Sequence, residues 1–356
     1  MKLGMLHLFE NPVGKTEREV VREQFDLMVA AEDLGFDSIQ PAEHHFSEYG
    51  YLASPQVSLA AVASRTRRLR LGTGVVVLPF HNPIRVAEDF AFLDLLSDGR
   101  IDLGVGRGYQ PMEFEGFGID QSRSRQMFAE AVELIKRCWT EERVTFHGEF
   151  YRADELWVRP KPVQKPHPPI YMACLSPDSF AIAGAAGHNV FMSSAFGLTV
   201  EQAKAGIAAY RQARADAGLD PAGGRVANLF MIYPGDSMDQ ARRDFRDPVL
   251  WYYRTIAKYV APPVDRPPVK SYEGYQQVTR MAQAVQFEDL LNSPILVCGD
   301  VDYCTHKVID MAREFGFNEM LCWTRIGGLE QRKVLRAMDL IAGKVIPGVK
   351  KVLGDT

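Results

Sequence analysis

The sequence predicts an α/β fold, and within that class a (β/α)8 TIM barrel with loop insertions, built on a parallel eight-stranded barrel. Three observations support this class: the length of 356 residues, eight short apolar runs, and helix-like segments between those runs. Strands that alternate with helices form parallel sheets through right-handed crossovers, and closing eight such units is the simplest architecture for that count. An open doubly wound sheet is the alternative. The runs interpreted as strands cover residues 2–9, 37–45, 69–79, 100–108, 170–176, 189–194, 225–235 and 317–323.

Local signals mark where the helices between these strands begin and end. Thr16 and Glu19 form a capping box that opens an amphipathic helix, and Gly35 stops that helix. Ser54 followed by Pro55 is an N-cap with a first-turn proline, so the next helix begins there. Further helices are expected from about residue 83 to 97 and from about residue 122 to 140.

Three segments interrupt the alternation without indicating a second domain, so residues 1–356 are expected to form one barrel domain. A polar, hairpin-like insert covers residues 144–158, and a proline-rich link follows it at residues 159–169. The segment 261–276 is rich in proline and charge and is too long for a plain connector. Loops of that kind in compact domains are usually lids or binding loops, and a disordered surface loop is the alternative.

Composition excludes several classes of protein. The net charge is −4, from 41 basic and 45 acidic residues, and no basic stripe suggests nucleic-acid binding. The five cysteines are scattered and form no CxxC pair, which fits reduced thiols in the cytoplasm and gives no metal site. The first residues are interpreted as a strand and not as a signal peptide, and no apolar run is long enough for a membrane span.

The stretch "AEHHF" places Glu43, His44 and His45 at the end of the second predicted strand. Function in a barrel lies at the carboxyl ends of the strands, and successive side chains of a strand point to opposite faces. One of the two histidines is therefore a candidate for chemistry at the barrel mouth. The structural alternative is that both are hydrogen-bonded residues of a polar strand end.

A second group of residues suits an anion. Ser176 and Pro177 open a helix after the fifth strand, with Ser179 in its first turn, and free N–H groups there favour phosphate. Arg107 follows the fourth strand through glycines, and Arg125 lies near the start of the next helix. A guanidinium binds phosphate through two hydrogen bonds. Taken alone, the serines are an ordinary helix cap and each arginine a surface ion pair.

Several longer stretches resemble bacterial luciferase and its relatives, the luciferase-like flavin-dependent monooxygenases. They are "AEHHF", "LGTGVVVLPFHNPIRVAED", "LDLLSDGRIDLGVGRGY" and "FGIDQSRSR", and the similarity resumes in "MAREFGFNEMLCW". The register is close from residue 1 to about residue 194, whereas residues 199–293 match in outline. The EHH motif at this place in the chain is fairly specific, and the GVGRG stretch is shared more widely.

The resemblance implies an FMN site with its phosphate near the anion-binding residues and its isoalloxazine over the third strand. It also implies a non-prolyl cis peptide at Gly74–Val75. Two positions depart from luciferase: Leu175 replaces an acidic residue, and Gly106 replaces a reactive cysteine, so no thiol role carries over. The implied cofactor-binding residues are Gly74, Val75, Arg107, Arg125, Ala173, Leu175, Ser176 and Ser179.

By the same resemblance, the protein is a two-component monooxygenase that receives FMNH2 from a separate NAD(P)H:flavin reductase. The resemblance implies that it oxidises a small organic substrate with O2 through a C4a-peroxyflavin, with His44 and His45 as the candidate catalytic residues. His44 would be the acid/base that faces the flavin, and His45 would hold the loop or the ring of His44. The alternatives are a flavin or deazaflavin oxidoreductase that transfers hydride, and a non-catalytic flavin-binding protein.

Luciferase pairs through its second and third helices, which correspond here to residues 54–66 and 82–97, so we expect a homodimer. Small residues in the first of these helices permit close packing, and ordinary packing on the barrel is the alternative. The substrate stays undetermined, because aromatic residues that fit an apolar pocket are also common in barrel cores. Those residues are Phe9, Tyr109, Phe114, Phe191, Phe196, Trp251 and Trp323.

Overall fold

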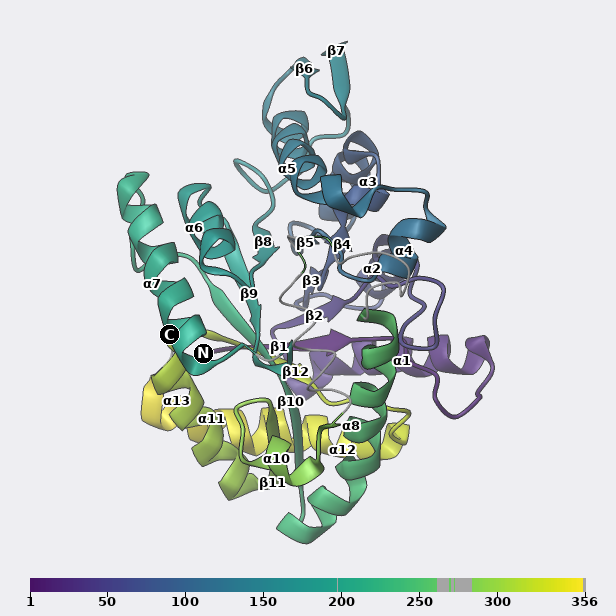
Figure 1. Cartoon of the computed structure of the whole chain (residues 1–356), viewed down its shortest axis with the longest axis vertical. Helices are drawn as coiled ribbons and strands as arrows, with labels where there is room; N and C mark the ends of the chain where they lie inside the picture. Colours follow the sequence, from purple (N-terminus) through teal and green to yellow (C-terminus); the bar gives the residue numbers. More distant parts are fainter. Residues whose placement is uncertain (197, 261–268, 270–271, 273–283, 355–356) are drawn as a thin grey trace.

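The computed structural model describes residues 1–196, 198–260, 269, 272 and 284–354. Eight parallel strands close into a barrel with helices around it, which confirms the predicted fold class (Figure 1). Closure occurs where the first strand pairs with the last, for example Leu3 with Met320. In order around the barrel the strands are β1 (Lys2–His7), β2 (Ser38–Pro41), β3 (Arg70–Gly72), β5 (Ile101–Gly106), β8 (Ile170–Ala173), β9 (Asn189–Ser193), β10 (Val226–Gly235) and β12 (Glu319–Trp323).

The predicted helix signals are found at the helix ends. Thr16 caps α1 with the full capping box, and Gly35 ends that helix with a φ of 94°. Ser54 occupies the N-cap of α2, although its side chain makes no capping hydrogen bond. The helices are α1 (Glu17–Leu34), α2 (Pro55–Ala63), α3 (Pro83–Leu96), α4 (Pro111–Gly116), α5 (Ser124–Thr140), α6 (Pro177–Ala185), α7 (Val200–Asp216), α8 (Met238–Val260), α10 (Phe287–Leu291), α11 (Val301–Phe315), α12 (Gln331–Leu340) and α13 (Ile346–Leu353).

Two sheet features lie outside the simple barrel. The predicted hairpin insert is present as the antiparallel pair β6 (Val144–His147) and β7 (Arg152–Leu156), at the top of Figure 1. A further strand, β11 (Leu296–Asp300), was not predicted. It pairs with the second half of β10, beyond the part of β10 that pairs with β9 and β12.

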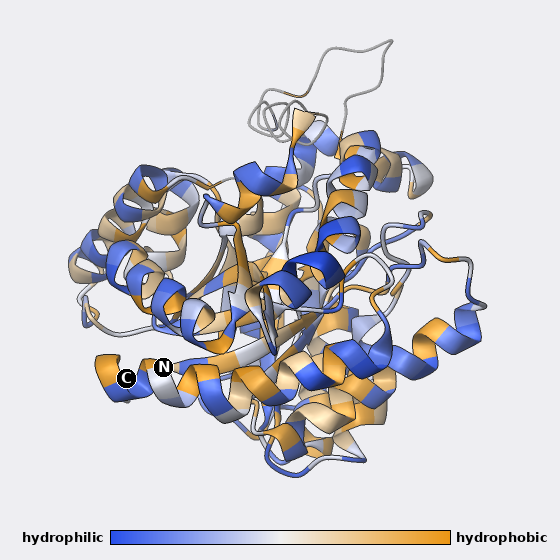
Figure 2. Ribbon diagram, turned by 90° about the horizontal axis from the view of Figure 1, so that it is seen from below, coloured by the Kyte–Doolittle hydropathy of each residue, from blue (hydrophilic) through white to orange (hydrophobic). Residues whose placement is uncertain are grey.

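The surrounding helices bury one face against the barrel. Most helices in Figure 2 show both hydrophilic and hydrophobic residues, as expected for helices of this kind. All five cysteines are buried and free of disulfide bonds. Within the described residues, no helix has the length and apolarity that a membrane span requires. The predicted lid at residues 261–276 lies outside the described residues, apart from Val269 and Tyr272.

Candidate active site

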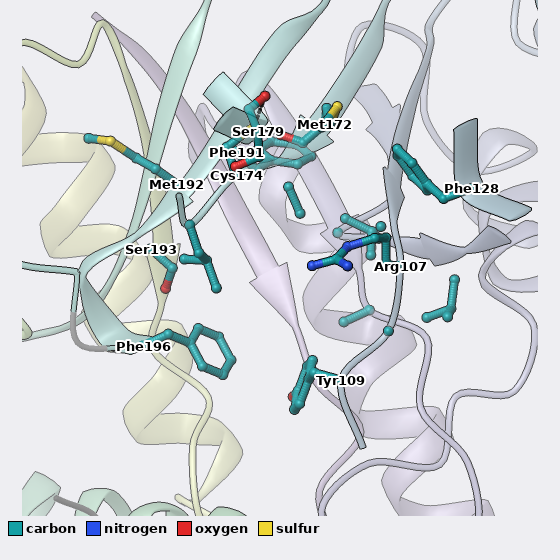
Figure 3. Close-up of a pocket in the computed structure, with 18 of the residues that line it drawn as sticks. Arg107, Tyr109, Phe128, Met172, Cys174, Ser179, Phe191, Met192, Ser193 and Phe196 are labelled. Atoms are coloured by element: carbon teal, nitrogen blue, oxygen red, sulfur yellow. Dashed lines mark hydrogen bonds between the residues drawn. The ribbon is translucent and has the colours of Figure 1, made fainter. Parts of the chain in front are cut away.

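A cavity of about 710 Å³ lies at the carboxyl ends of the barrel strands (Figure 3). Its walls come from the segments after β2, β5, β8 and β9, and from the turn between β3 and β4 (Val76–Val77). His44 lines this cavity, together with every predicted cofactor-binding residue. Those residues are Gly74, Val75, Arg107, Arg125, Ala173, Leu175, Ser176 and Ser179. The fold therefore brings together residues that are more than 100 positions apart in the sequence.

One end of the cavity carries the features that suit a phosphate. Arg107 extends its guanidinium into the open space below Ser179 (Figure 3), and its buried Nη1 has no hydrogen-bond partner among the described residues. The other face of this guanidinium is covered by the ring of Tyr272, with 5.0 Å between the Arg107 Cζ and the ring centroid. An arginine N–H that is buried without a partner is costly. A bound anion would remove that cost, so the site fits the phosphate of FMN.

The amino end of α6 completes this part of the cavity. The Ser179 hydroxyl donates to the Ser176 carbonyl at 2.6 Å, and the Ser176 N–H donates to the Ser179 Oγ at 3.1 Å. These two bonds fix the first turn of the helix, whose remaining N–H groups favour negative charge. Leu175 is 36% exposed and offers a backbone N–H but no polar side chain.

The wall between β3 and β5 is held by very close packing. Thr73 donates its hydroxyl to the Gly104 carbonyl at 2.7 Å and accepts from the Gly104 N–H at 3.0 Å. A Cβ at Gly104 would lie 1.8 Å from the Thr73 carbonyl oxygen, and a Cβ at Gly106 would lie 2.6 Å from Val75 Cγ2. The peptide Gly74–Val75 is cis, which confirms that prediction. The glycines of "LGVGRG" therefore let the turn at Gly74–Val75 approach β5.

His44 is held from both ring nitrogens. Its Nδ1 lies 2.9 Å from Glu113 Oε1 and 3.2 Å from Gln110 Nε2, while its Nε2 lies 3.3 Å from the hydroxyl of Tyr109. Glu113 is fully buried in the short helix α4 and also accepts the backbone N–H of His45 at 2.9 Å. A carboxylate at Nδ1 fixes the ring and directs Nε2 toward the cavity. Sequence analysis missed Glu113, because an acid in a short helix gives no signal of a histidine partner.

His45 does not line the cavity and turns away from it. Its Nε2 lies 2.8 Å from Glu43 Oε1, and its ring packs edge-on against Phe117 at 4.7 Å between centroids. Glu43 also contacts His81 Nε2 at 2.7 Å and accepts the N–H of Val77 at 2.8 Å. Burial acts to raise the pKa of Glu43, but the hydrogen bonds from His45 and His81 outweigh it and hold that pKa below its usual range. Glu43 therefore holds His45, His81 and the backbone at Val77 together, and His45 contacts this carboxylate and not the cavity.

The aromatic residues proposed for an apolar pocket divide into two groups. Tyr109, Phe191, Phe196 and Trp323 line the cavity, and the rings of Tyr109 and Phe196 lie 5.7 Å apart at the lower end of Figure 3. Phe9, Phe114 and Trp251 are not among its lining residues. Phe9 and Trp251 belong to or pack against the surrounding core, which is the alternative role stated for such residues, and Phe114 is buried against Phe80.

Comparison with known proteins agrees with this site. The model of the family "Luciferase-like monooxygenase" matches residues 1–319 of the chain. The chain belongs to the luciferase-like monooxygenase family. One relative is named a flavin-dependent monooxygenase and another a monooxygenase, and the chain is itself a flavin-dependent monooxygenase of this family. The resemblance inferred from the EHH and GVGRG stretches is thereby confirmed.

Three relatives illustrate the similarity. The chain is 29% identical over 347 residues to a 4-hydroxyprotoasukamycin monooxygenase of Streptomyces nodosus subsp. asukaensis, covering 95% of this chain and 89% of the relative. It is 34% identical over 178 residues to the oxygenase component of a flavin-dependent trigonelline monooxygenase of Acinetobacter baylyi, covering 49% of each. The crystal structure of monooxygenase RslO1 from Streptomyces bottropensis superposes with a TM-score of 0.86 at 30% identity, covering 98% of this chain and 99% of that one.

Proposed function

We propose that this luciferase-like monooxygenase is the oxygenase component of a two-component system. It would use FMNH2 supplied by a separate NAD(P)H:flavin reductase to oxidise a small organic substrate with O2. The observation that carries the proposal is one cavity lined both by Arg107, whose Nη1 has no hydrogen-bond partner among the described residues, and by the pair of His44 and Glu113. The relative named an oxygenase component supports the separate reductase.

Different residues of the cavity would bind the phosphate and the ring system of the cofactor. Arg107 and Arg125 would neutralise the phosphate, and the N–H groups of Leu175 and Ser176 would bind its oxygens. The turn at Gly74–Val75 offers a backbone wall against which a flat ring system can lie. Bound reduced flavin supplies the activation of oxygen, while the protein supplies orientation and a site shielded from water.

We further propose that His44 moves the proton that this chemistry requires. Glu113 holds Nδ1, so Nε2 is the nitrogen that takes or gives a proton on the cavity side. Glu113 is buried, and its Oε2 has no hydrogen-bond partner among the described residues. A carboxylate in this position fixes the orientation of the imidazole ring. His45 is a positioning residue in this proposal, because it contacts Glu43 and not the cavity.

Two further expectations belong to this proposal. We infer a homodimer through α2 and α3, because Val57, Phe92, Leu95 and Leu96 on these helices are exposed. We also infer a reducing cytoplasmic location, since all five cysteines are unpaired.

The site assignment is tested by comparing two variants. Arg107→Ala should weaken FMN binding by roughly 10- to 100-fold, because it removes charge-assisted hydrogen bonds to the phosphate. His44→Ala should leave the FMN dissociation constant nearly unchanged but slow the proton-dependent steps of oxidation by ~10²- to 10⁴-fold. Fluorescence titration with FMN measures the first effect. Stopped-flow absorbance after mixing photoreduced FMN and protein with aerated buffer measures the second.

The matched control is Arg123→Ala, which removes an exposed arginine that contacts Phe150 and Glu149 on the hairpin side. It should bind FMN like the unaltered protein. Equal and small effects of Arg107→Ala and His44→Ala would contradict the site assignment. Flavin that reoxidises on the protein as it does in free solution would favour hydride transfer instead, and reduced deazaflavin would then be the cofactor to test.

A further inference from the structure

Three tyrosines from separate parts of the chain, the half-buried Tyr109 and the buried Tyr49 and Tyr252, form a series of hydroxyls that begins at His44. Tyr109 follows β5, Tyr49 lies in the loop after β2, and Tyr252 belongs to α8. The Tyr109 hydroxyl lies 3.3 Å from His44 Nε2 and 2.9 Å from the Tyr49 hydroxyl. The Tyr49 hydroxyl in turn lies 3.3 Å from that of Tyr252. Tyr49 and Tyr252 are 1% and 0% exposed, so the far part of this series is enclosed by protein.

The partners of these hydroxyls differ from those of other buried tyrosines in the same molecule. Tyr210 donates to the carbonyl of His188 at 2.8 Å, and Tyr253 donates to the carbonyl of Ala195 at 3.0 Å. A carbonyl can only accept, so each of those hydroxyls has one fixed direction. Tyr49 instead lies between two other phenols. Because a phenol both donates and accepts, a series of phenols can be hydrogen bonded in either direction.

Each direction of the hydrogen bonds along this series corresponds to one protonation state of His44. In neutral His44 with Nδ1–H donating to Glu113, Nε2 is an acceptor, so Tyr109 donates to it. Tyr49 then donates to Tyr109, and Tyr252 donates to Tyr49. When His44 takes a proton at Nε2, the new N–H becomes a donor and Tyr109 must accept from it. Each hydroxyl then turns to the next, from Tyr109 to Tyr49 and from Tyr49 to Tyr252.

We propose that Tyr109, Tyr49 and Tyr252 form a reversible hydroxyl chain that lets His44 serve as both proton acceptor and proton donor. Every O–H bond is retained during the reversal, and the one proton transferred is the proton that His44 Nε2 takes from the reacting group and later returns, so charge and atoms balance. Tyr49 and Tyr252 are positioning residues that act through Tyr109. The inference rests on the proposed acid/base role of His44.

The charged and polar groups around His44 contact Nδ1 or other residues, so Tyr109 is the hydrogen-bond partner of Nε2. Glu113 of α4 faces Nδ1, Gln110 lies on the same side, and Glu43 on the loop of His44 itself is engaged by His45 and His81. The ring of Tyr49 packs edge-on against His44 at 4.9 Å between centroids. Burial raises the pKa of both Tyr49 and Tyr252 well above the usual value, so both phenols stay protonated and available as donors.

The test compares Tyr49→Phe and Tyr252→Phe with Tyr253→Phe. Each variant keeps a buried ring and removes one hydroxyl, but Tyr253 lies outside the chain. The first readout is the ¹⁵N chemical shift of His44 Nε2 in flavin-free protein, assigned by its loss in His44→Ala. Tyr49→Phe should move this shift, Tyr252→Phe should move it less, and Tyr253→Phe should leave it in place.

The second readout is the pH profile and solvent isotope effect of reoxidation of protein-bound reduced FMN. Tyr49→Phe should slow this step by roughly 3- to 10-fold, since one hydrogen bond is lost in one direction of the chain. Identical behaviour of Tyr49→Phe and Tyr253→Phe in both readouts would overturn the proposal. If Tyr49→Phe moves the ¹⁵N shift but leaves the reoxidation rate and its pH profile unchanged, the hydroxyl chain exists but has no role in proton handling, and the proposal is overturned. Because the ¹⁵N shift is measured without flavin, this outcome can be distinguished from a loss of FMN binding.

Discussion

Glu319 begins β12 at the end of the barrel opposite the cavity, and it is a buried carboxyl that the proposed chemistry does not use. Tyr171 donates its hydroxyl to Glu319 Oε2 at 3.0 Å. Burial raises the pKa of Glu319 from 4.5 to about 7, although the bond from Tyr171 works against that rise. The nearby carboxyl of Asp102 adds to the effect. The folded protein therefore binds a proton at Glu319 more tightly than the unfolded chain does.

This shift predicts how stability depends on pH. The contribution of Glu319 is fully present below pH 4.5 and is lost as the pH rises through about 7, because the folded pKa is the higher one. Glu319→Gln should therefore gain roughly 3 kcal/mol of unfolding free energy relative to the unaltered protein between pH 5 and pH 8. Urea unfolding at several pH values measures this. The exposed Glu314→Gln is the control, and parallel pH curves for Glu319→Gln and the unaltered protein would contradict the prediction.

The placement of single residues around the cavity could be predicted where it follows from position along the chain. His44, Arg107 and Ser176 stand at carboxyl ends of strands, and a barrel places those ends around one cavity. Glu113 and Tyr252 were not predicted, because their partners lie 69 positions from Glu113 and 203 positions from Tyr252. No local sequence pattern encodes a pairing over such a distance, so these contacts can be identified only from the tertiary structure.

At the scale of elements, the close contact between Thr73 and β5 decides the shape of the cavity wall. Gly104→Ala would drive a Cβ to 1.8 Å from the Thr73 carbonyl oxygen. Since the contact is with backbone, the strands must separate to relieve it. We expect a loss of several kcal/mol of stability (about 3 kcal/mol or more for a severe overpacking) together with weaker FMN binding.

A matched glycine provides the control for this prediction. Gly343 in the π-helical segment Ile341–Val345 has no atom within 4 Å of an added Cβ, so Gly343→Ala should be neutral or stabilise by ~0.5–1 kcal/mol. Thermal unfolding and FMN titration of both variants measure the difference. Similar melting temperatures for the two variants would show that the Thr73 backbone and β5 can separate at little cost, and would refute the prediction.

The prediction of elements succeeded where one run of sequence decides one element. All eight barrel strands and the hairpin insert carried such signals, which are apolar runs bounded by turns. β11 was missed because its place depends on β10. β10 is ten residues long, and its second half, Met231–Gly235, continues beyond the pairing with β12 and offers a free edge that β11 occupies.

For the whole molecule, the exposed apolar face of α3 bears on assembly. Phe92 and Leu96 are 55% and 56% exposed, and Leu95 beside them is 44% exposed. Residues three and four apart share one face of a helix, and α2 packs beside α3 with Val57 exposed on it. Exposed apolar side chains gathered on one face of a helix favour contact with another protein surface. This supports the proposed homodimer.

If the proposed homodimer forms through this face, the double variant Phe92→Asp with Leu96→Asp should be monomeric, because it would bury two carboxylates at the centre of that interface. Light scattering coupled to size-exclusion chromatography measures the mass in solution. Trp157→Asp is the control, since Trp157 is exposed on the strand link beyond β7 and lies outside α2 and α3. A mass equal to one chain for the unaltered protein at micromolar concentration would refute the homodimer.

The burial of every cysteine has a practical consequence for an oxygen-handling enzyme. Burial raises the pKa of all five thiols, so the reactive thiolate is scarce at neutral pH. Oxidation by peroxide follows thiolate character and exposure. Peroxide released by unproductive turnover would therefore find these sulfurs slow to react. For the same reason, a single cysteine introduced on the surface would take up a maleimide dye selectively, without removal of any native thiol.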